Sequence, residues 1–494
     1  MSRPSSILPI PRTVALTGGT RRWPKRFEVD CRTEAARPLA DAFGKLSGGG
    51  EGAIRLTLRA SDSPLSAQGY TLLLETDAVQ GQANDIAGFR HALTTLEQLL
   101  SEPYMPIGRI DDAPALKLRG FHLNFESYRR MDFDTALRFI ETAARFKLNA
   151  LLVEYGPRFP LEAYPDLRDP AALTLQQIAR LNEAATACGI LLIPLQQSLA
   201  HLEYVLRYER FTGLRERPPK FNLLCPMHDE SLPLIKSLAA EVMTAHPCGG
   251  SAFFHLGGDE ARKIGECPRC RPLVEKEGVG AVYGRYMGQL ARWVMEQGRR
   301  PIIWDDVVCA HPEALEHLPK ETIIQYWDYI AVADPTPVLI PRMSHAQGGP
   351  RVAHDWSWSV PGRRKKLPTV VQDVMRNYSR PSRLRASLGD DYLEKYGAYL
   401  GPGFPKLIRA LPYLEYYQDR GFDVITSPTG MGNGDTEDGT PNFNRFEANI
   451  RTHAQRCSSN GRALGLITTA WYDVPPELLY QPLVRTAMCG WSGS

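Results

Sequence analysis

The sequence lacks any apolar run long enough to cross a bilayer, and residues 1–14 hold three prolines but no apolar core of a secretory signal. An excess of charge of one sign is also missing, because 58 Lys and Arg against 55 Asp and Glu leave a net charge of only +3. We therefore expect neither nucleic acid nor an anionic membrane as a partner. The nine cysteines are too few and too scattered for a disulfide framework, so we expect a cytoplasmic protein.

The chain has an ordinary globular composition, with 43% hydrophobic and 23% charged residues, and its 494 residues exceed one small domain. Residues 1–112 predict a small α/β domain. In it, a strand-like alternation at 53–59 and an apolar run at 69–75 precede an amphipathic helix at 85–100. We place the domain boundary in the polar, turn-rich segment 108–114.

From residue 113 to 494, short apolar runs alternate with amphipathic helices. Such runs predict strands buried on both faces of a parallel sheet. Eight strand–helix units predict a (β/α)₈ TIM barrel, with a doubly wound open sheet as the alternative. The interval at about 329–420 is too long for a barrel connection, so we expect an excursion with helices near 392–399 and 404–417. The predicted strands are 118–125, 149–155, 190–195, 252–256, 301–304, 322–327, 422–426 and 463–468.

The strongest chemical signal is FFHLGGDE at 253–260, an apolar strand followed by two glycines and two acids. Neighbouring side chains of a strand point to opposite faces, so Asp259 and Glu260 can share a pocket only where the chain leaves the pleat. Gly257 and Gly258 permit that departure. In a barrel, these acids would lie at the carboxyl end, where active sites form. Two acids in one site cannot both ionise freely, so we expect one pKa to rise and provide a general acid.

The HLGGDE segment resembles the H-x-G-G-D-E signature of the family 20 glycoside hydrolases, the β-N-acetylhexosaminidases. Residues 112–120 are similar to the entry of that family's barrel, and the hexosaminidase D subgroup is similar at 151–160, 193–206, 266–270 and 468–472. The resemblance implies exo-acting, retaining hydrolysis of terminal β-linked N-acetylglucosamine or N-acetylgalactosamine, with the sugar's acetamido oxygen as nucleophile. Asp259 would hold the acetamido N–H, and Glu260 would protonate the leaving oxygen and later activate water. Neither a metal nor a cofactor is then expected.

Aromatic residues at the ends of predicted strands are candidate walls of a sugar pocket. Trp304, Trp327 and Trp471 are each placed this way, and aromatic rings stack well on the C–H faces of sugars. Ordinary barrel packing is the alternative for any one of them. The polar residues beside them are candidates for binding sugar hydroxyls, with loop solvation as the alternative: Asp305, and Asp328 or Tyr329.

His201 follows the third predicted strand, and the resemblance places it near the acid pair, where it could bond a carboxylate and shift its pKa. A structural role is the alternative for a single histidine. Glu154 ends the second strand, either at the rim of the site or in a turn that caps a helix. Cys267 and Cys270 form a C-x-x-C, but a structural zinc needs four protein ligands and no second pair exists, so we expect no metal. Further ligands would have to come from Cys225, His228 or His255.

The sequence departs from the family pattern in two places. The stretch 123–130 has no Arg where the family has one for the sugar hydroxyls, although Arg129 or Arg130 could substitute. The stretch 427–434 has no Tyr for the acetamido carbonyl, and Tyr329 could serve instead. The choice between the two sugar epimers therefore stays open, as does the oligomeric state, with a homodimer as one option. The alternative functions are a sugar-binding barrel without catalysis, a metal-dependent hydrolase, and an enzyme for an unacetylated hexosaminide.

Overall fold

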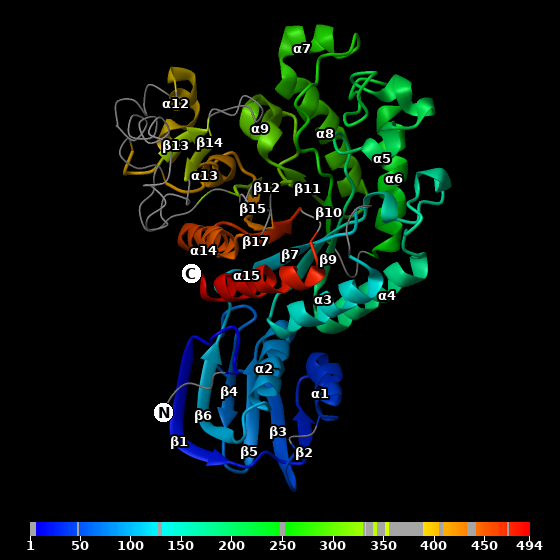
Figure 1. The fold of residues 1–494 in the computed structure, drawn as a ribbon. Coiled ribbons are helices and arrows are strands. Elements are labelled where there is room, and N and C mark those ends of the chain that lie inside the picture. The colour runs from blue at the N-terminus through cyan, green and yellow to red at the C-terminus, as the bar shows by residue number, and fades with distance from the viewer. Residues whose placement is uncertain are drawn as a thin grey trace.

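Eight parallel strands close into a barrel, as the sequence predicts, and the doubly wound alternative is excluded (Figure 1). Each strand pairs with its neighbour in chain order, and the last, β17, pairs with both β15 and β7. Their apolar side chains are buried because the barrel interior and the surrounding helices cover both faces. The strands are β7 Leu118–Asn124, β8 Ala150–Glu154, β9 Leu191–Leu195, β10 Phe253–His255, β11 Arg300–Trp304, β12 Ile323–Trp327, β15 Asp423–Ser427 and β17 Gly465–Ala470; the short β16, Thr429–Met431, adds to β17.

The structure is a computed structural model of the chain. It describes residues 6–46, 49–126, 131–247, 252–329, 331, 339–342, 351–354, 389–404, 409–431, 441–471 and 474–494.

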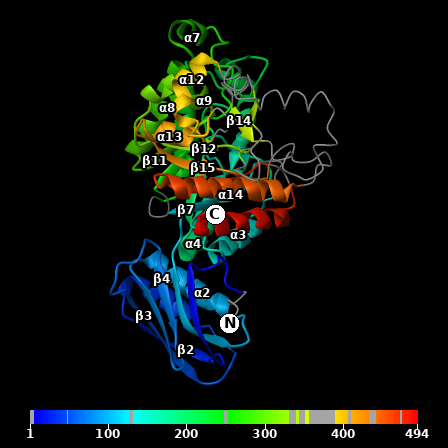
Figure 2. The same ribbon diagram turned by 90° about the vertical axis from the view of Figure 1, so that its left-hand side faces the viewer.

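Helices between the strands cover the outside of the barrel (Figures 1 and 2). Asp132 caps α3 by accepting the N–H of Thr135, and Thr174 caps α4 in a capping box. A 3₁₀ turn, Pro476–Leu479, leads into α15. The helices are α3 Phe133–Arg145, α4 Leu175–Cys188, α5 Glu203–Leu206, α6 Ser231–Ala245, α7 Arg271–Glu277, α8 Val279–Glu296, α9 Asp306–Ala310, α14 Phe443–Asn460 and α15 Tyr480–Ser492.

A six-stranded mixed sheet, ordered β1-β6-β4-β5-β3-β2, forms the separate N-terminal part below the barrel in both views (Figures 1 and 2). Residues 108–112, expected in a turn, instead end strand β6. The backbone N–H and C=O groups of these residues are hydrogen-bonded because β6 pairs with both β1 and β4. Gly108 allows the backbone to approach Ala15 closely. The elements are β1 Thr13–Arg21, β2 Arg26–Cys31, α1 Arg37–Phe43, β3 Ala53–Ala60, β4 Tyr70–Leu74, β5 Ala78–Ala83, α2 Ile86–Leu99 and β6 Met105–Asp112.

The excursion between β12 and β15 carries structure of its own. Strands β13, Leu339–Arg342, and β14, Arg351–His354, form an antiparallel pair. Helix α12, Asp390–Tyr396, confirms the helix expected near 392–399. Of the helix expected at 404–417, residues 405–408 lie outside the described part of the chain, and α13 covers only Tyr413–Gln418, after Leu411 with its non-helical positive φ of 53°.

A buried charged cluster joins the two parts at the amino end of the barrel. Lys147, between α3 and β8, lies 3.5 Å from the carboxylate of Asp112, and both side chains are inaccessible to solvent. Asp112 also accepts the indole N–H of Trp491 from α15 at 2.9 Å. Arg119, at the start of β7, donates to the backbone oxygen of Lys147. The cluster therefore ties the N-terminal sheet to the barrel and to the C-terminal helix.

Candidate active site

The loop after β10 carries Asp259 and Glu260 at the carboxyl end of the barrel. Gly257 and Gly258 adopt positive φ angles of 63° and 86°, and Glu260 follows at 54°. A Cβ on Gly257 would lie 1.9 Å from the side-chain oxygen of Gln197, so no other residue fits there. The two glycines thus turn the chain out of the pleat, as the sequence predicts, and successive acids no longer point to opposite faces.

His201, in the loop after β9, lies between the two acids. Its Nε2 is 3.3 Å from Asp259 Oδ2 and 3.8 Å from Glu260 Oε2. His201 also adopts a positive φ of 54°, which a non-glycine residue holds only where the surrounding structure enforces it. One imidazole within reach of both carboxylates shows that the two acids share one pocket.

The charges of this trio shift its proton affinities. Burial lowers the pKa of His201, but the carboxylates of Asp259, Glu260 and Glu203 outweigh burial and raise it to about 10. Burial raises the pKa of Asp259, but the charge and hydrogen bond of His201 outweigh that effect, and the pKa falls below its ordinary value. Repulsion between the acids was expected to raise one pKa; at Asp259 it does not, because a cationic His201 lies between the pair. Asp259 is therefore ionised at neutral pH.

One oxygen of Asp259 has no hydrogen-bond donor among the residues that the structure describes. Oδ2 faces His201, whereas Oδ1 is buried and lacks any such partner, in a residue that is only 8% exposed. An unsatisfied buried acceptor costs about 1–3 kcal/mol. A ligand that brings an N–H or O–H to this oxygen would recover that free energy.

Glu260 is more open and is held from two sides. Its side chain is 38% exposed, and one carboxylate oxygen pairs with Arg262 at 2.5 Å. Its backbone N–H donates to Asp306 Oδ2 at 2.9 Å, which fixes the turn between the two acids. The Glu260 carboxylate is thus placed beside Asp259 while remaining within reach of solvent and ligand.

Three tryptophans and a tyrosine gather at the same end of the barrel. The rings of Trp304 and Trp471 lie 5.8 Å apart, and those of Trp327 and Tyr329 lie 4.8 Å apart. The indole N–H of Trp471 donates to the hydroxyl of Tyr329 at 2.6 Å. Trp304 is fully buried, which favours the packing alternative for this ring, whereas the other three are half-buried. Trp327, Tyr329 and Trp471 can therefore contact a ligand, over a floor that includes Trp304.

Glu154 and Asp305 lie at this end too, but their carboxylates already have partners within the protein. Glu154 accepts from Gln197 at 3.0 Å and lies 3.2 Å from the Nε2 of His122. Asp305 accepts the backbone N–H of Trp327 at 3.1 Å, and its other oxygen accepts a tyrosine hydroxyl at 3.2 Å. Both residues are at most 2% exposed. This geometry favours a positioning role, and direct sugar contact by either residue stays a prediction.

Sequence reasoning missed several residues that support the acids. Gln197 lies inside the 193–206 resemblance, and Asp306 directly follows a candidate at a strand end, so both carried a usable signal. Arg262 and His122 carried no such signal beyond their places near the motif and on the first strand, respectively.

Of the expected alternatives, Asp328 is 5% exposed and accepts the N–H of Ala331, and Arg129 and Arg130 lie outside the described residues.

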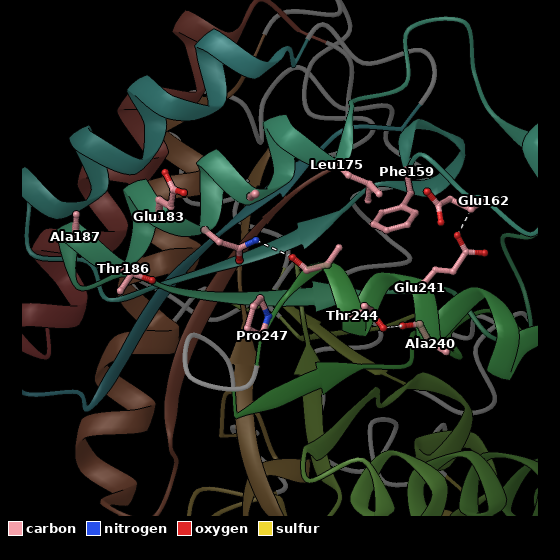
Figure 3. Close-up of a pocket in the computed structure, with 13 residues that line it drawn as sticks. Phe159, Glu162, Leu175, Glu183, Thr186, Ala187, Ala240, Glu241, Thr244 and Pro247 are labelled. Atoms are coloured by element: carbon pink, nitrogen blue, oxygen red, sulfur yellow. Dashed lines mark hydrogen bonds between the residues drawn. The ribbon is translucent and has the colours of Figure 1, made fainter.

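A cavity of about 950 Å³ lies away from this pocket, between helices α4 and α6 on the outside of the barrel (Figure 3). Leu175 and Glu183 line it from α4, and Ala240 and Glu241 line it from α6. It contains none of the residues that the sequence singled out, and Glu241 already accepts the backbone N–H of Ala163 at 3.0 Å. Its size alone therefore does not mark it as a reactive site.

Comparison with known proteins gives consistent matches over both parts of the chain. The profile described as glycosyl hydrolase family 20, catalytic domain, matches residues 118–337, and that described as family 20, domain 2, matches residues 4–113. Hexosaminidase D of Bos taurus is 31% identical over 194 residues, which cover 38% of this chain and 56% of that protein. A beta-N-acetylhexosaminidase of Cellulomonas fimi is 24% identical over 351 residues, which cover 63% of this chain and 64% of that protein.

Solved structures extend the likeness to the whole fold. The GH20 beta-N-acetylhexosaminidase of Streptomyces coelicolor A3(2) aligns with a TM-score of 0.66 at 15% identity, over 99% of this chain and 92% of that one. At an identity this low, the structural likeness shows a shared fold and nothing further. The chain spans less than two thirds of the length of the two sequence relatives, at 56% and 64%.

Proposed function

This chain belongs to glycosyl hydrolase family 20, and we propose that it is an exo-acting β-N-acetylhexosaminidase. The proposed substrates are carbohydrates or glycoconjugates that end in β-linked N-acetylglucosamine or N-acetylgalactosamine. The observation that carries the proposal is the ionised Asp259, with one buried, unsatisfied oxygen, beside the more open Glu260 in a single pocket. A 2-acetamido group supplies the N–H that such an oxygen lacks.

Two carboxylates with these properties suit substrate-assisted hydrolysis with retention. Asp259 accepts the acetamido N–H and makes the acetamido oxygen a better nucleophile. That oxygen forms a bond to the anomeric carbon as the bond to the leaving oxygen breaks, and Glu260 gives its proton to the leaving oxygen. Water then attacks the anomeric carbon, Glu260 takes its proton, and the acetamido group is restored.

His201 is the residue that separates the two acid roles. Its positive charge favours the ionised form of Asp259 and so keeps that carboxylate an acceptor throughout the reaction. Since Asp259 holds no proton to give, the acid–base role belongs to Glu260. The half-buried Trp327, Tyr329 and Trp471 form the proposed wall for the sugar ring.

Two alternatives remain as outcomes of the test. An unsatisfied buried carboxylate oxygen lowers stability. A barrel that only binds sugar has no need of such an oxygen beside a second acid. An unacetylated hexosaminide substrate would bring its 2-ammonium group to Asp259. The negative charge of Asp259 would also suit that ammonium group. We prefer an N-acetylated substrate because hydrolysis of such a substrate also gives Glu260 a role and matches the reaction of the family.

The test is hydrolysis of p-nitrophenyl β-N-acetylglucosaminide and the matching galactosaminide by the wild type and by Asp259→Asn. We expect the wild type to cleave at least one of them, and the variant to lose about 10²–10³-fold in kcat, because the amide neither polarises the acetamido group nor pairs with His201. A thiazoline mimic of the cyclic intermediate should inhibit the wild type more strongly than the variant. Wild-type silence on both substrates, with cleavage of an unacetylated glucosaminide, would replace this function by the second alternative.

We also propose a cytoplasmic location and a division into domains at residue 112, between β6 and β7. No disulfide joins any of the eight cysteines that the structure describes, which supports a reducing compartment. Among the described helices, none combines the length and the apolar character that a bilayer span requires.

A further inference from the structure

Three cysteines and one glutamate meet in a buried cluster that the proposed hydrolysis does not use. Cys225 Sγ lies 3.4 Å from Cys267 Sγ and 3.5 Å from Cys270 Sγ. Cys270 Sγ lies 3.1 Å from Oε2 of Glu216. One ligand atom from each of the four residues lies within 4.8 Å of all the others, and no member is more than 5% exposed.

We propose that Glu216, Cys225, Cys267 and Cys270 bind one structural Zn²⁺ ion. Tetrahedral zinc with Zn–S bonds of about 2.3 Å places its sulfur ligands about 3.8 Å apart, only slightly farther than the separations found here. Three soft thiolates in a tetrahedral arrangement select zinc over the hard cations Mg²⁺ and Ca²⁺. Four protein ligands close the coordination sphere, which is the arrangement of a structural rather than a catalytic site.

The ligands are oriented by hydrogen bonds of the kind that surround metal sites. Oε1 of Glu216 accepts the backbone N–H groups of Gly265 at 2.8 Å and of Cys267 at 3.0 Å, which turns Oε2 toward the thiols. The N–H of Cys270 donates to the sulfur of Cys267 at 3.2 Å. Such bonds to the atoms behind or beside the ligand fix its direction and stabilise its charged form.

Charge gives an independent reason for a cation. Glu216 is fully buried, and no Lys, Arg or His forms an ion pair with it in the part of the chain that the structure describes. The basic residues on either side of it in sequence are engaged elsewhere: Arg217 pairs with Glu266, and Arg215 donates to the backbone oxygens of Leu206 and Pro218. Burying a carboxylate without a cation is costly, and a bound Zn²⁺ supplies that charge.

The cluster joins the two loops that carry the proposed catalytic machinery. Glu216 and Cys225 lie between β9 and α6, in the same connection as His201, and an antiparallel bridge between Arg215 and Leu224 brings them together. Cys267 and Cys270 lie between β10 and α7, a few residues after the acid pair. From the sequence we expect no metal, because a structural zinc needs four protein ligands and the C-x-x-C provides two. The fold brings Cys225 to it and adds Glu216, whereas His255 instead accepts the N–H of Gly257.

The metal content of the wild-type chain is the first test. The full chain is purified without chelator in a non-coordinating reductant, and its metals are counted by inductively coupled plasma mass spectrometry. We expect about one zinc per chain. Exchange of that zinc for Co²⁺ should give the near-ultraviolet thiolate-to-cobalt charge-transfer absorption and the visible bands of a tetrahedral site. These readouts do not depend on glycosidase activity, so they stand or fall separately from the proposed function.

Variants assign the metal to these ligands. Cys270→Ser should abolish zinc retention, and Glu216→Gln should weaken zinc binding by at least about 10–100-fold, which is the loss when only a residue behind a ligand is removed. Cys489→Ser, at a buried cysteine outside the cluster, should retain zinc like the wild type. A wild-type chain that stays metal-free after zinc loading, a Cys225–Cys267 disulfide found by mass spectrometry, or undiminished zinc in Cys270→Ser would each overturn the proposal. The first two outcomes are read on the wild type, so misfolding of a variant does not affect them.

Discussion

At the amino end of the barrel Lys147 lies 3.5 Å from Asp112, and at the carboxyl end His201 lies 3.3 Å from Asp259. Both ends therefore hold a basic group against a buried carboxylate, and both basic residues adopt a positive φ, 62° for Lys147 and 54° for His201. The two ends differ in whether both oxygens of the carboxylate accept a hydrogen bond. Asp112 accepts from Trp491 with one oxygen and from the Tyr70 hydroxyl with the other. Asp259 keeps one oxygen without a donor among the described residues.

Neither the presence of a buried carboxylate nor the positive φ of the basic residue distinguishes the two ends. Solvent access does, because the His201 side chain is 34% exposed and that of Lys147 is fully buried. At the amino end, the ion pair of Lys147 with Asp112 and the hydrogen bonds that Asp112 accepts hold the N-terminal sheet to the barrel, so these charges act on stability. At the carboxyl end, an acceptor is left for a molecule that arrives from outside, so its charges act on binding and reaction.

The strongest test of this division is Glu260→Gln, which removes the proposed proton donor. We expect kcat on a glycoside with a poor leaving group to fall by about 10²–10⁴-fold, because the leaving oxygen then receives no proton. The fall should be smaller on p-nitrophenyl substrates, which need less acid assistance. The free energy of unfolding in urea should change little, since the side chain is 38% exposed. Glu209→Gln, at an exposed acid in the same connection between β9 and α6, is the matched control and should keep most of its activity.

The converse change is Lys147→Met at the amino end. It removes the amine that donates to the hydroxyls of Thr95 at 2.7 Å and Tyr70 at 3.0 Å and that lies against Asp112, and we expect a loss of about 3–5 kcal/mol in the free energy of unfolding because these buried groups lose their partner. The value of kcat/KM should stay within about twofold of the wild type wherever the variant is folded. Lys117→Met, at an exposed lysine nearby, should affect neither quantity. A Lys147→Met enzyme of normal stability and lost activity would contradict the division between the two ends.

The two ends should also respond to pH with opposite sign. Carboxylates raise the pKa of His201 from 6.5 to about 10, so its stabilising charge is fully present below pH 6.5 and is lost as the pH rises toward 10. Burial lowers the pKa of Lys147 from 10.5 to about 8, so the folded chain gives up that proton before the unfolded chain does. Its contribution to stability therefore rises between pH 8 and 10.5.

Urea unfolding of the wild type, His201→Gln and Lys147→Met across this range checks both signs. The stability difference between the wild type and His201→Gln should narrow as the pH rises from 6.5 to 10. The difference between the wild type and Lys147→Met should widen above pH 8. Differences that move in the same direction would show that one of these two environments is assigned wrongly.

All eight barrel strands were predictable because each is a short apolar run buried on both faces, of which β9, LLIPL, is a clear example. In the N-terminal sheet, β3 and β4 were predictable from the same kind of pattern, at 53–59 and 69–75. Strands β1 and β5 were not, since they are half-exposed, rich in glycine or glutamine, and held mainly by pairing with distant strands. The acid pair and its glycines were predictable because their chemistry is local. Contacts between separate loops left no such signal: Glu216 lies 51 residues before Cys267, in no spacing that marks a metal ligand.

The smallest expected effect concerns Tyr329, which we predict to replace the family's acetamido-binding tyrosine. In that role it would donate its O–H to the acetamido carbonyl while its oxygen accepts from Trp471. Tyr329→Phe should lower kcat/KM by about fivefold to tenfold, since one hydrogen bond contributes about 0.5–1.5 kcal/mol. The loss of the Trp471 contact alone could produce a decrease of that size, so the decrease by itself does not assign the role.

A fluorinated substrate separates the two explanations. Trifluoroacetyl in place of acetyl weakens the carbonyl as an acceptor but leaves the contact between Tyr329 and Trp471 unchanged. If Tyr329 bonds the carbonyl, the penalty of Tyr329→Phe should shrink on the N-trifluoroacetyl substrate, because there is less of a bond to lose. If the hydroxyl only holds Trp471, the penalty should be the same on both substrates. An equal penalty would therefore place Tyr329 with the supporting residues of the carboxyl end, beside Glu154 and Asp305, and leave the acetamido carbonyl to another donor.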